Sequence, residues 1–195
     1  MNLIMAMIVL TGSQLDPLLL RMESAEYITG SFTQTDLWAL TLEEEYSEGI
    51  LHLARPDLFL LDYTDPSGSA IGFDGSVLYE IDALARQAIV YNTDSQEGFL
   101  HMLQRCAEDS SVVSSETLGD SVMIVLQGDF GQGISGMEVG FTLSDSLPFF
   151  FSTTDSNGNT TSYTLGGLTV FASVPEGVFS MNVPPDYEII DQQGI

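Results

Sequence analysis

The sequence predicts a mainly β protein with helices (the α+β class), built on one strongly curved antiparallel sheet. Between residues 47 and 87, short runs of alternating apolar and polar side chains follow one another closely, as in β-strands. Turn sequences separate these runs, among them Asp65-Pro66-Ser67-Gly68 and the hairpin signal Asp74-Gly75. Because consecutive strands with short connections pair with each other, we expect an incomplete barrel of about eleven strands with helices on its concave side.

The chain begins with an apolar segment, MNLIMAMIVL, that has the length of the hydrophobic region of a signal peptide. Small residues follow at Thr11, Gly12 and Ser13, where cleavage can occur. A basic segment is missing before the apolar run, so a first helix packed on the core stays an alternative. We expect residues 1–13 to be a signal-peptide remnant and residues 14–195 to form a single half-barrel domain.

A helix is expected directly after this segment. Asp16 and Pro17 are a typical helix start, with Asp16 as the N-cap and Pro17 at the first helical position. Leu18, Leu19 and Met22 then recur at helical spacing, so the helix is expected to run to about residue 26.

A second helix is expected in the middle of the chain, over about residues 94–107. Its apolar stripe contains Phe99, Leu100 and Leu103. One helix inserted into an otherwise all-strand region is well placed to cover the open mouth or one face of the sheet.

The remaining segments have the period of two that is typical of strands. Leu51, Leu53 and Arg55 lie on one face of the strand before Pro56. A charged residue among so many apolar ones needs a polar partner or solvent. Segments with a strand-like pattern cover residues 27–35, 48–55, 58–63, 69–73, 76–82, 87–92, 111–118, 121–129, 137–143, 148–154, 160–165, 168–174 and 187–190.

The charge of the chain excludes one class of partner. Acidic residues outnumber basic ones by 28 to 4, the formal net charge is −24, and the basic residues are all arginines. A nucleic-acid-binding protein is excluded, because nothing would neutralise a row of phosphates. Docking onto an anionic membrane surface is disfavoured for the same reason. A basic protein partner or a cationic ligand fits this charge, and the alternative is that acidity only serves solubility in salty surroundings.

No catalytic or metal-ligating constellation stands out in the sequence. His52 and His101 are the only histidines, and neither has a metal-ligating partner at short spacing. Cys106, the only cysteine, lies five residues after His101, which turns the two side chains away from each other on a helix. Residues 155–159 predict a hairpin turn rather than a calcium loop, because the later bidentate glutamate is missing. We therefore expect no enzyme, no cofactor and no metal ion.

Several short motifs occur in a fixed order along the chain. They are Phe32-Thr33-Gln34, Gly49, Arg55-Pro56-Asp57-Leu58-Phe59, Pro66, Asp74-Gly75, Leu78-Tyr79, Gln87, Asp155 with Gly158, and Phe179 with Pro184. This ordered set, which spans roughly residues 27–190, resembles the LolA family of periplasmic carriers of outer-membrane lipoproteins.

The resemblance implies a half-barrel with a helical lid that holds the acyl chains of a lipoprotein in its concave interior. It also implies that Arg55 bonds to the lid and latches it, that Phe59 engages an inner-membrane releasing complex, and that an outer-membrane acceptor takes the cargo. The lid helix would contribute Phe99, Leu100 and Leu103. The residues expected to line the cavity are Phe32, Leu51, Leu53, Phe59, Leu61, Tyr63, Ile71, Phe73, Val77, Tyr79, Ile89 and Tyr91.

The function expected from this resemblance is that of a monomeric lipoprotein chaperone in the periplasm. The absence of lysine departs from well-known members, so their particular partner surfaces need not apply. The alternative is a non-enzymatic module on the same half-barrel that senses lipids or lipoproteins without carrying them.

Overall fold

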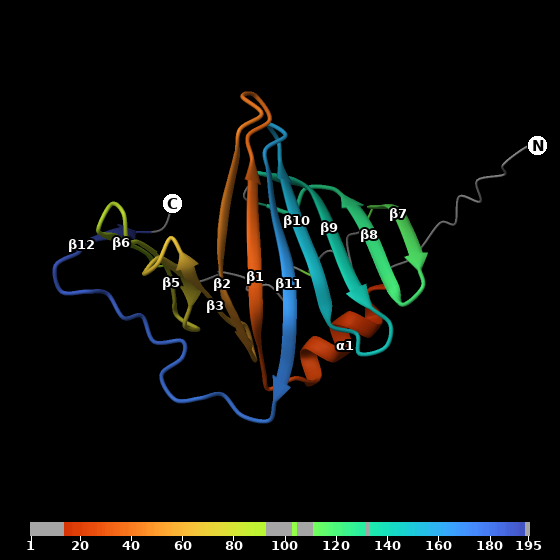
Figure 1. Cartoon of the computed structure of the whole chain (residues 1–195), viewed down its shortest axis with the longest axis horizontal. Helices are drawn as coiled ribbons and strands as arrows, with labels where there is room; N and C mark the ends of the chain where they lie inside the picture. The colour runs from red at the N-terminus through yellow and green to blue at the C-terminus, as the bar shows by residue number, and fades with distance from the viewer. Residues whose placement is uncertain (1–13, 93–102, 105–110, 132, 194–195) are drawn as a thin grey trace, which may run out of the picture.

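One curved, unclosed sheet of twelve strands forms the frame of the molecule (Figure 1). The computed structural model describes residues 14–92, 103–104, 111–131 and 133–193. The predicted fold class, an incomplete barrel with an N-terminal helix, is confirmed. The elements are α1 (Asp16–Ser24), β1 (Tyr27–Leu37), β2 (Glu44–Ala54), β3 (Leu58–Asp65), β4 (Ala70–Phe73), β5 (Val77–Asp82), β6 (Gln87–Asn92), β7 (Ser111–Leu118), β8 (Ser121–Gln127), β9 (Ile134–Thr142), β10 (Pro148–Asp155), β11 (Thr160–Phe171) and β12 (Glu188–Gln193).

The strands follow the order β12-β6-β5-β4-β3-β2-β1-β11-β10-β9-β8-β7. Consecutive strands pair antiparallel from β1 to β6 and from β7 to β11, as the short connections predict, and the pairing of β11 with β1 joins these two runs in the middle of the sheet. The pairing of β12 with β6 is parallel, which departs from the expected all-antiparallel meander. This difference arises because the chain reaches β12 through a long crossing segment rather than a hairpin (Figure 1).

The strand β11 corrects one predicted boundary. Residues 160–165 and 168–174 were expected as two strands, because Gly166 and Gly167 look like a break. The structure has one strand that runs through both glycines. The register with β1 shifts at this place, between Thr29 and Ser31, and Gly167 adopts a φ of 60°. The glycines therefore form an irregularity within a strand and do not end it.

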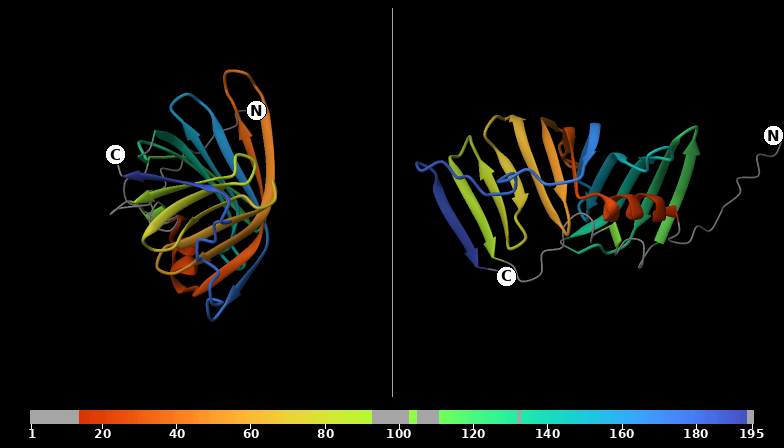
Figure 2. Two further views of the ribbon diagram at one scale, coloured as in Figure 1. Left: turned by 90° about the vertical axis from the view of Figure 1, so that its left-hand side faces the viewer. Right: turned by 90° about the horizontal axis from the view of Figure 1, so that it is seen from below.

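Helix α1 packs on the concave side of the sheet (Figure 2). Leu18 and Met22 are buried, as their spacing predicts, and Pro17 lies in the first turn. The prediction that Asp16 is the N-cap is wrong: Leu15 precedes the helix in helical conformation, and no side chain caps it. Asp16 instead puts a negative charge in the first turn, where the helix dipole favours it.

The helix predicted over about residues 94–107 falls mostly outside the described residues, and so do the predicted lid residues Phe99 and Leu100. Leu103 and Gln104 are described and helical. Leu103 is fully buried in the same core as α1, and Gln104 Nε2 donates to Glu23 Oε1 of α1 at 2.9 Å. Among the helical residues that the structure describes, no helix is long and apolar enough to cross a membrane.

Residues 172–187, called the strap below, cover part of the convex side of the sheet, over β1 to β6. The strap runs from the end of β11 to the start of β12 (Figure 1). Phe179 packs there with Tyr27 and Ala54, and Met181 and Val183 pack against Tyr79 and its neighbours. Because β3 is covered on both sides, its apolar residues do not alternate with polar ones.

His52 belongs to this convex side, as its position opposite Arg55 predicts. Its Nδ1 atom lies 2.6 Å from the hydroxyl of Tyr27, and the two rings stack with centroids 6.0 Å apart. Partial burial lowers the pKa of His52, and the nearby charge of Asp62 opposes this shift. His52 is therefore a packed boundary residue.

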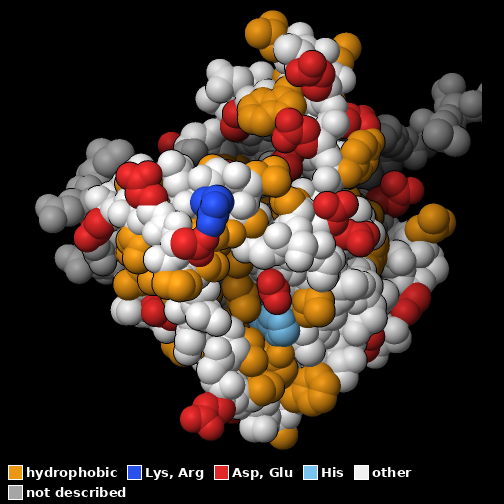
Figure 3. All heavy atoms as spheres, turned by 60° about the vertical axis from the view of Figure 1, so that its left-hand side comes forward, with side chains coloured by type: hydrophobic (Ala, Val, Ile, Leu, Met, Phe, Trp, Pro, Cys, Tyr) orange, Lys and Arg blue, Asp and Glu red, His pale blue; other side chains and the backbone are white. Residues whose placement is uncertain are grey.

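Acidic side chains dominate the surface. Figure 3 shows them scattered over the face that it views, with a single basic group among them. Two ion pairs are found among the described residues, Arg55 with Glu26 and Arg86 with Asp186, and all four side chains are about half exposed. Most of the carboxylates that the structure describes therefore form no ion pair with another described residue.

Candidate functional site

The concave side of the sheet carries a continuous apolar surface. Phe32, Leu51, Leu53 and Tyr63 are buried in one cluster with α1. Phe59, Leu61 and Ile71 pack against the same cluster and stay partly exposed. These residues were all predicted to share a cavity, and β1, β2, β3 and β4 bring them together because their registers align alternate positions on one side.

The registers extend this surface across the sheet as far as β6. Phe59 pairs with Phe73, Phe73 with Leu78, and Leu78 with Tyr91, so the four side chains form one row across β3 to β6. A second row leads from Leu61 through Ile71 and Glu80 to Ile89. Phe73, Ile89 and Tyr91 therefore lie on the predicted side.

The predicted placement of Val77 and Tyr79 on the concave side is wrong. The Asp74-Gly75 turn pairs Phe73 with Leu78, so the neighbours of Leu78 point to the opposite side. Tyr79 is buried under the strap, and a Cβ added at Gly72 would meet its hydroxyl at 2.5 Å. Burial raises the pKa of Tyr79 to about 12. Leu78 lies on the concave side instead, where Val77 and Tyr79 were predicted.

Gly49 explains how the aromatic part of the surface is packed. The ring of Phe32 lies over Gly49, where a Cβ would meet it at 2.8 Å and the carbonyl oxygen of Asp62 at 2.2 Å. Phe32 and Tyr63 meet edge to face, with ring centroids 5.2 Å apart. The glycine thus makes room for the central ring of the apolar surface.

A polar network ends the apolar surface on the side of the β1–β2 turn. The Tyr63 hydroxyl donates to Gln34 Oε1 at 2.6 Å, and Gln34 Nε2 donates to Asp36 Oδ2 at 2.6 Å. Thr161 Oγ1 donates to Asp36 Oδ1 at 2.5 Å. Burial raises the pKa of Tyr63, and the Asp36 carboxylate adds to the shift, so the phenol stays protonated and keeps donating.

This network was missed in the sequence, although Phe32-Thr33-Gln34 was recognised as a motif. Gln34 and Asp36 share the face of Phe32 by strand parity, which is the signal that was available. Their partner Tyr63 comes from β3 and Thr161 from β11, and only the sheet order brings these strands to β1.

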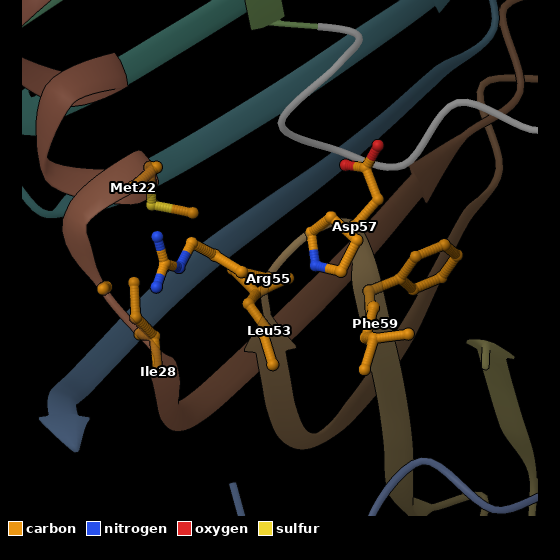
Figure 4. Close-up of a pocket in the computed structure, with 10 residues that line it drawn as sticks. Met22, Ile28, Leu53, Arg55, Asp57 and Phe59 are labelled. Carbon is orange, nitrogen blue, oxygen red and sulfur yellow. The ribbon is translucent and has the colours of Figure 1, made fainter. Parts of the chain in front are cut away.

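At its other end the surface leads to a pocket beside Arg55 (Figure 4). The pocket has a volume of about 30 Å³, and Arg55 points toward Met22 on α1, with Leu53 and Ile28 beneath it. The Arg55 guanidinium pairs with the carboxylate of Glu26, directly after α1. The register of Tyr27 with Ala54 explains this contact, because it places the preceding Glu26 across from Arg55.

This partner differs from the one that the resemblance implies, which is the helical lid. The Arg55 side chain is 45% exposed, and the partner found is a side chain on the N-terminal side of β1. The peptide bond between Arg55 and Pro56 is cis. A role of Arg55 as a latch stays a prediction.

The sequence of this chain is similar to those of known proteins. The family model described as "Outer membrane lipoprotein carrier protein LolA" matches residues 23–182, which include β1 to β11 and most of the strap. The chain belongs to the LolA family. An outer-membrane lipoprotein carrier protein from Neisseria meningitidis is 25% identical over 172 residues, which cover 85% of this chain and 81% of the relative.

Solved structures share the fold of this LolA family member. An uncharacterized conserved protein from Thermus thermophilus superposes with a TM-score of 0.58 at 14% identity, over 92% of this chain and 99% of the other. A DUF1329 family protein from Desulfovibrio piger gives a TM-score of 0.50 at 8% identity, over 86% of this chain and 95% of the other. At such identities the likeness is one of fold alone.

Proposed function

We propose that this protein carries lipoproteins across the periplasm to the outer membrane, with their acyl chains held against the concave face of the sheet. The observation that carries the proposal is the apolar surface on the concave side of β1 to β6, which Glu80 interrupts on β5, with α1 packed over part of it. Membership of the LolA family and the lipoprotein carrier of Neisseria meningitidis support it. The proposed protein is a binding protein and not an enzyme.

The hydrophobic effect explains why such a carrier is needed. Each methylene group removed from water contributes about 0.8 kcal/mol. An acyl chain of about fifteen methylenes therefore gains roughly 12 kcal/mol when it is covered, and free lipoprotein in an aqueous compartment is negligible. A concave apolar surface with a removable helix provides this cover and still permits release.

Opening is part of the proposed mechanism. The pocket beside Arg55 has a volume of about 30 Å³, roughly the share of one water molecule in the liquid. An acyl chain enters it only if α1 moves away from Leu53 and Ile28. The cost of that opening lowers the apparent affinity for cargo, which favours hand-over from an inner-membrane releasing complex to an outer-membrane acceptor.

A hydrophobic fluorescent probe tests the proposed site in the purified chain. We expect the probe to bind with enhanced fluorescence and to be displaced by a long-chain fatty acid. Leu61→Asn places a polar group on the concave surface and weakens probe binding about fivefold. Ile50→Asn is the matched control, because Ile50 is exposed on the opposite side of the neighbouring strand. No signal above that of a folded control protein, or equal losses in the two variants, would contradict the proposed cavity.

A further inference from the structure

Four large apolar side chains stand exposed around the turn between β1 and β2. Trp38, Leu40, Leu42 and Tyr46, called the tip surface below, are 46%, 95%, 74% and 63% exposed. The hairpin projects beyond the rest of the sheet (Figure 1), and Figure 3 shows hydrophobic side chains at its projecting end. Nothing in the described part of the chain covers them.

The turn holds these side chains in place. Trp38 N donates to the carbonyl of Glu43 at 3.0 Å, and Leu42 N donates to the carbonyl of Trp38 at 2.7 Å. Asn159 of the adjacent β10–β11 hairpin braces the turn by accepting a hydrogen bond from Ala39 N at 3.1 Å. The tip surface is therefore presented on a fixed loop.

Leu42 is a poor choice for its backbone conformation. Its φ is 59°, in the left-handed region where glycine and asparagine are preferred. Its side chain gains little from burial, since it is 74% exposed. Neither turn formation nor packing explains a leucine at this position. Its side chain is therefore available for contact with another molecule.

The apolar side chains are bordered by negative charge. Glu43, Glu44 and Glu45 follow directly and are exposed. An open groove of about 690 Å³ lies beside them, lined by Trp38, Leu40, Thr41, Glu43, Glu45, Asn157 and Asn159. The groove thus combines an indole face, aliphatic groups and carboxylates, and the described residues that line it include no basic side chain.

We infer that the tip surface docks a basic protein segment that presents aliphatic side chains. Lysine or arginine side chains would pair with Glu43 and Glu45 and lie over the indole of Trp38. An anionic bilayer is disfavoured, because three carboxylates border the tip and the whole chain carries −24. A second copy is disfavoured for the same reason, since it brings the same charge.

This inference goes beyond the proposed carrier function. The tip lies at the start of β2 and Arg55 directly after its end, and the 11 residues of β2 span roughly 36 Å. A partner can therefore occupy the tip while the concave surface holds cargo. The two functions can also fail separately, because Leu61→Asn alters the concave surface alone and the Leu40 and Leu42 variants alter the tip surface alone.

Trp38 gives the experiment a built-in signal, because it is the only tryptophan of the chain. The probe is a synthetic amphipathic helical peptide of leucine and lysine, titrated into the full chain at low salt. We expect saturable binding and a blue shift of the Trp38 emission. Leu40→Ser with Leu42→Ser should weaken binding about tenfold. Glu43, Glu44 and Glu45 changed to Gln should weaken it and flatten its salt dependence.

The matched control is Leu84→Ser with Leu118→Ser, two leucines that are 83% and 78% exposed, in the β5–β6 turn and at the end of β7. This control should bind the peptide like the unchanged chain, and all variants should keep the binding of the hydrophobic probe. Equal losses in tip and control variants would overturn the inference. So would equal binding of a leucine–glutamate peptide, or a blue shift produced by phosphatidylcholine vesicles in place of the peptide.

Discussion

At the scale of single residues, Arg55 and Glu26 link the end of β2 to the chain that leaves α1. Both side chains are about half exposed, at 45% and 49%. Exposed ion pairs contribute only about 0.2–1 kcal/mol, because water and salt screen them. In the proposed mechanism, a contact of this strength would bias α1 toward the closed position without fixing it there.

Replacing the arginine tests this role. Arg55→Leu should still bind acyl chains but pass them on slowly. Without the latch, opening costs less, so apparent affinity rises by up to about fivefold and release slows in proportion. The measurement is the rate at which a fluorescent lipopeptide moves from the loaded protein to phosphatidylcholine vesicles.

Two further variants make this test specific. Glu26→Gln should slow transfer in the same direction, because it removes the partner of Arg55. Arg86→Leu is the control, since it breaks the other exposed ion pair, with Asp186, near β6. Transfer at the normal rate by Arg55→Leu would exclude the latch.

At the scale of elements, the strap has no periodic sequence pattern that predicts its structure. It nevertheless contributes buried side chains to the convex side of the sheet. Phe179 is 7% exposed and meets Tyr27 edge to face at 6.4 Å between centroids. Phe179→Ala should therefore lower the free energy of unfolding by about 3–5 kcal/mol. The exposed strap residue Val174 changed to Ala should cost less than about 0.5 kcal/mol.

Denaturant unfolding of the two variants gives these free energies. At concentrations where Phe179→Ala stays folded, its affinity for the hydrophobic probe should be unchanged, because the strap lies on the convex side. A loss of probe binding in the folded variant would show that the two sides of the sheet are coupled. An unchanged unfolding free energy would show that the strap is not packed as described.

Strand positions and most of the concave surface were predictable, because period-two patterns survive wherever one side of a strand is more apolar than the other. Leu51, Leu53, Phe59 and Leu61 follow from parity within their own strands. The error at Tyr79 has a different origin. The face of β5 is set by the register of a hairpin, and one residue of register turns every side chain over.

Contacts between distant segments were not predictable by these rules. The pair of Arg55 with Glu26 and the bond of Asp36 with Thr161 depend on β1 lying between β2 and β11. Local patterns carry no information on that strand order, and the resemblance to a family supplied the architecture but not these partners. The left-handed backbone of Leu42 is a local feature, but it too is seen only in the structure.

At the scale of the whole molecule, charge is the dominant feature. The chain carries −24 with 28 acidic and 4 basic residues, and only two ion pairs are found in the part that the structure describes. Like charges on a compact surface repel one another and destabilise the folded state. The fold therefore depends on its buried concave and convex clusters and on the screening of its surface.

Salt should consequently stabilise this protein. The Debye length falls from roughly 14 Å at 0.05 M to about 4 Å at 0.5 M ionic strength, which removes most repulsion between exposed carboxylates. We expect the thermal midpoint to rise by about 5 °C over this range, as a gain of about 1–2 kcal/mol would give. NaCl and KCl should act alike, because screening depends on ionic strength, and Gln in place of Glu43, Glu44 and Glu45 should reduce the effect. A midpoint that stays constant or falls with salt would mean that favourable ion pairs, and not repulsion, govern the surface of this molecule.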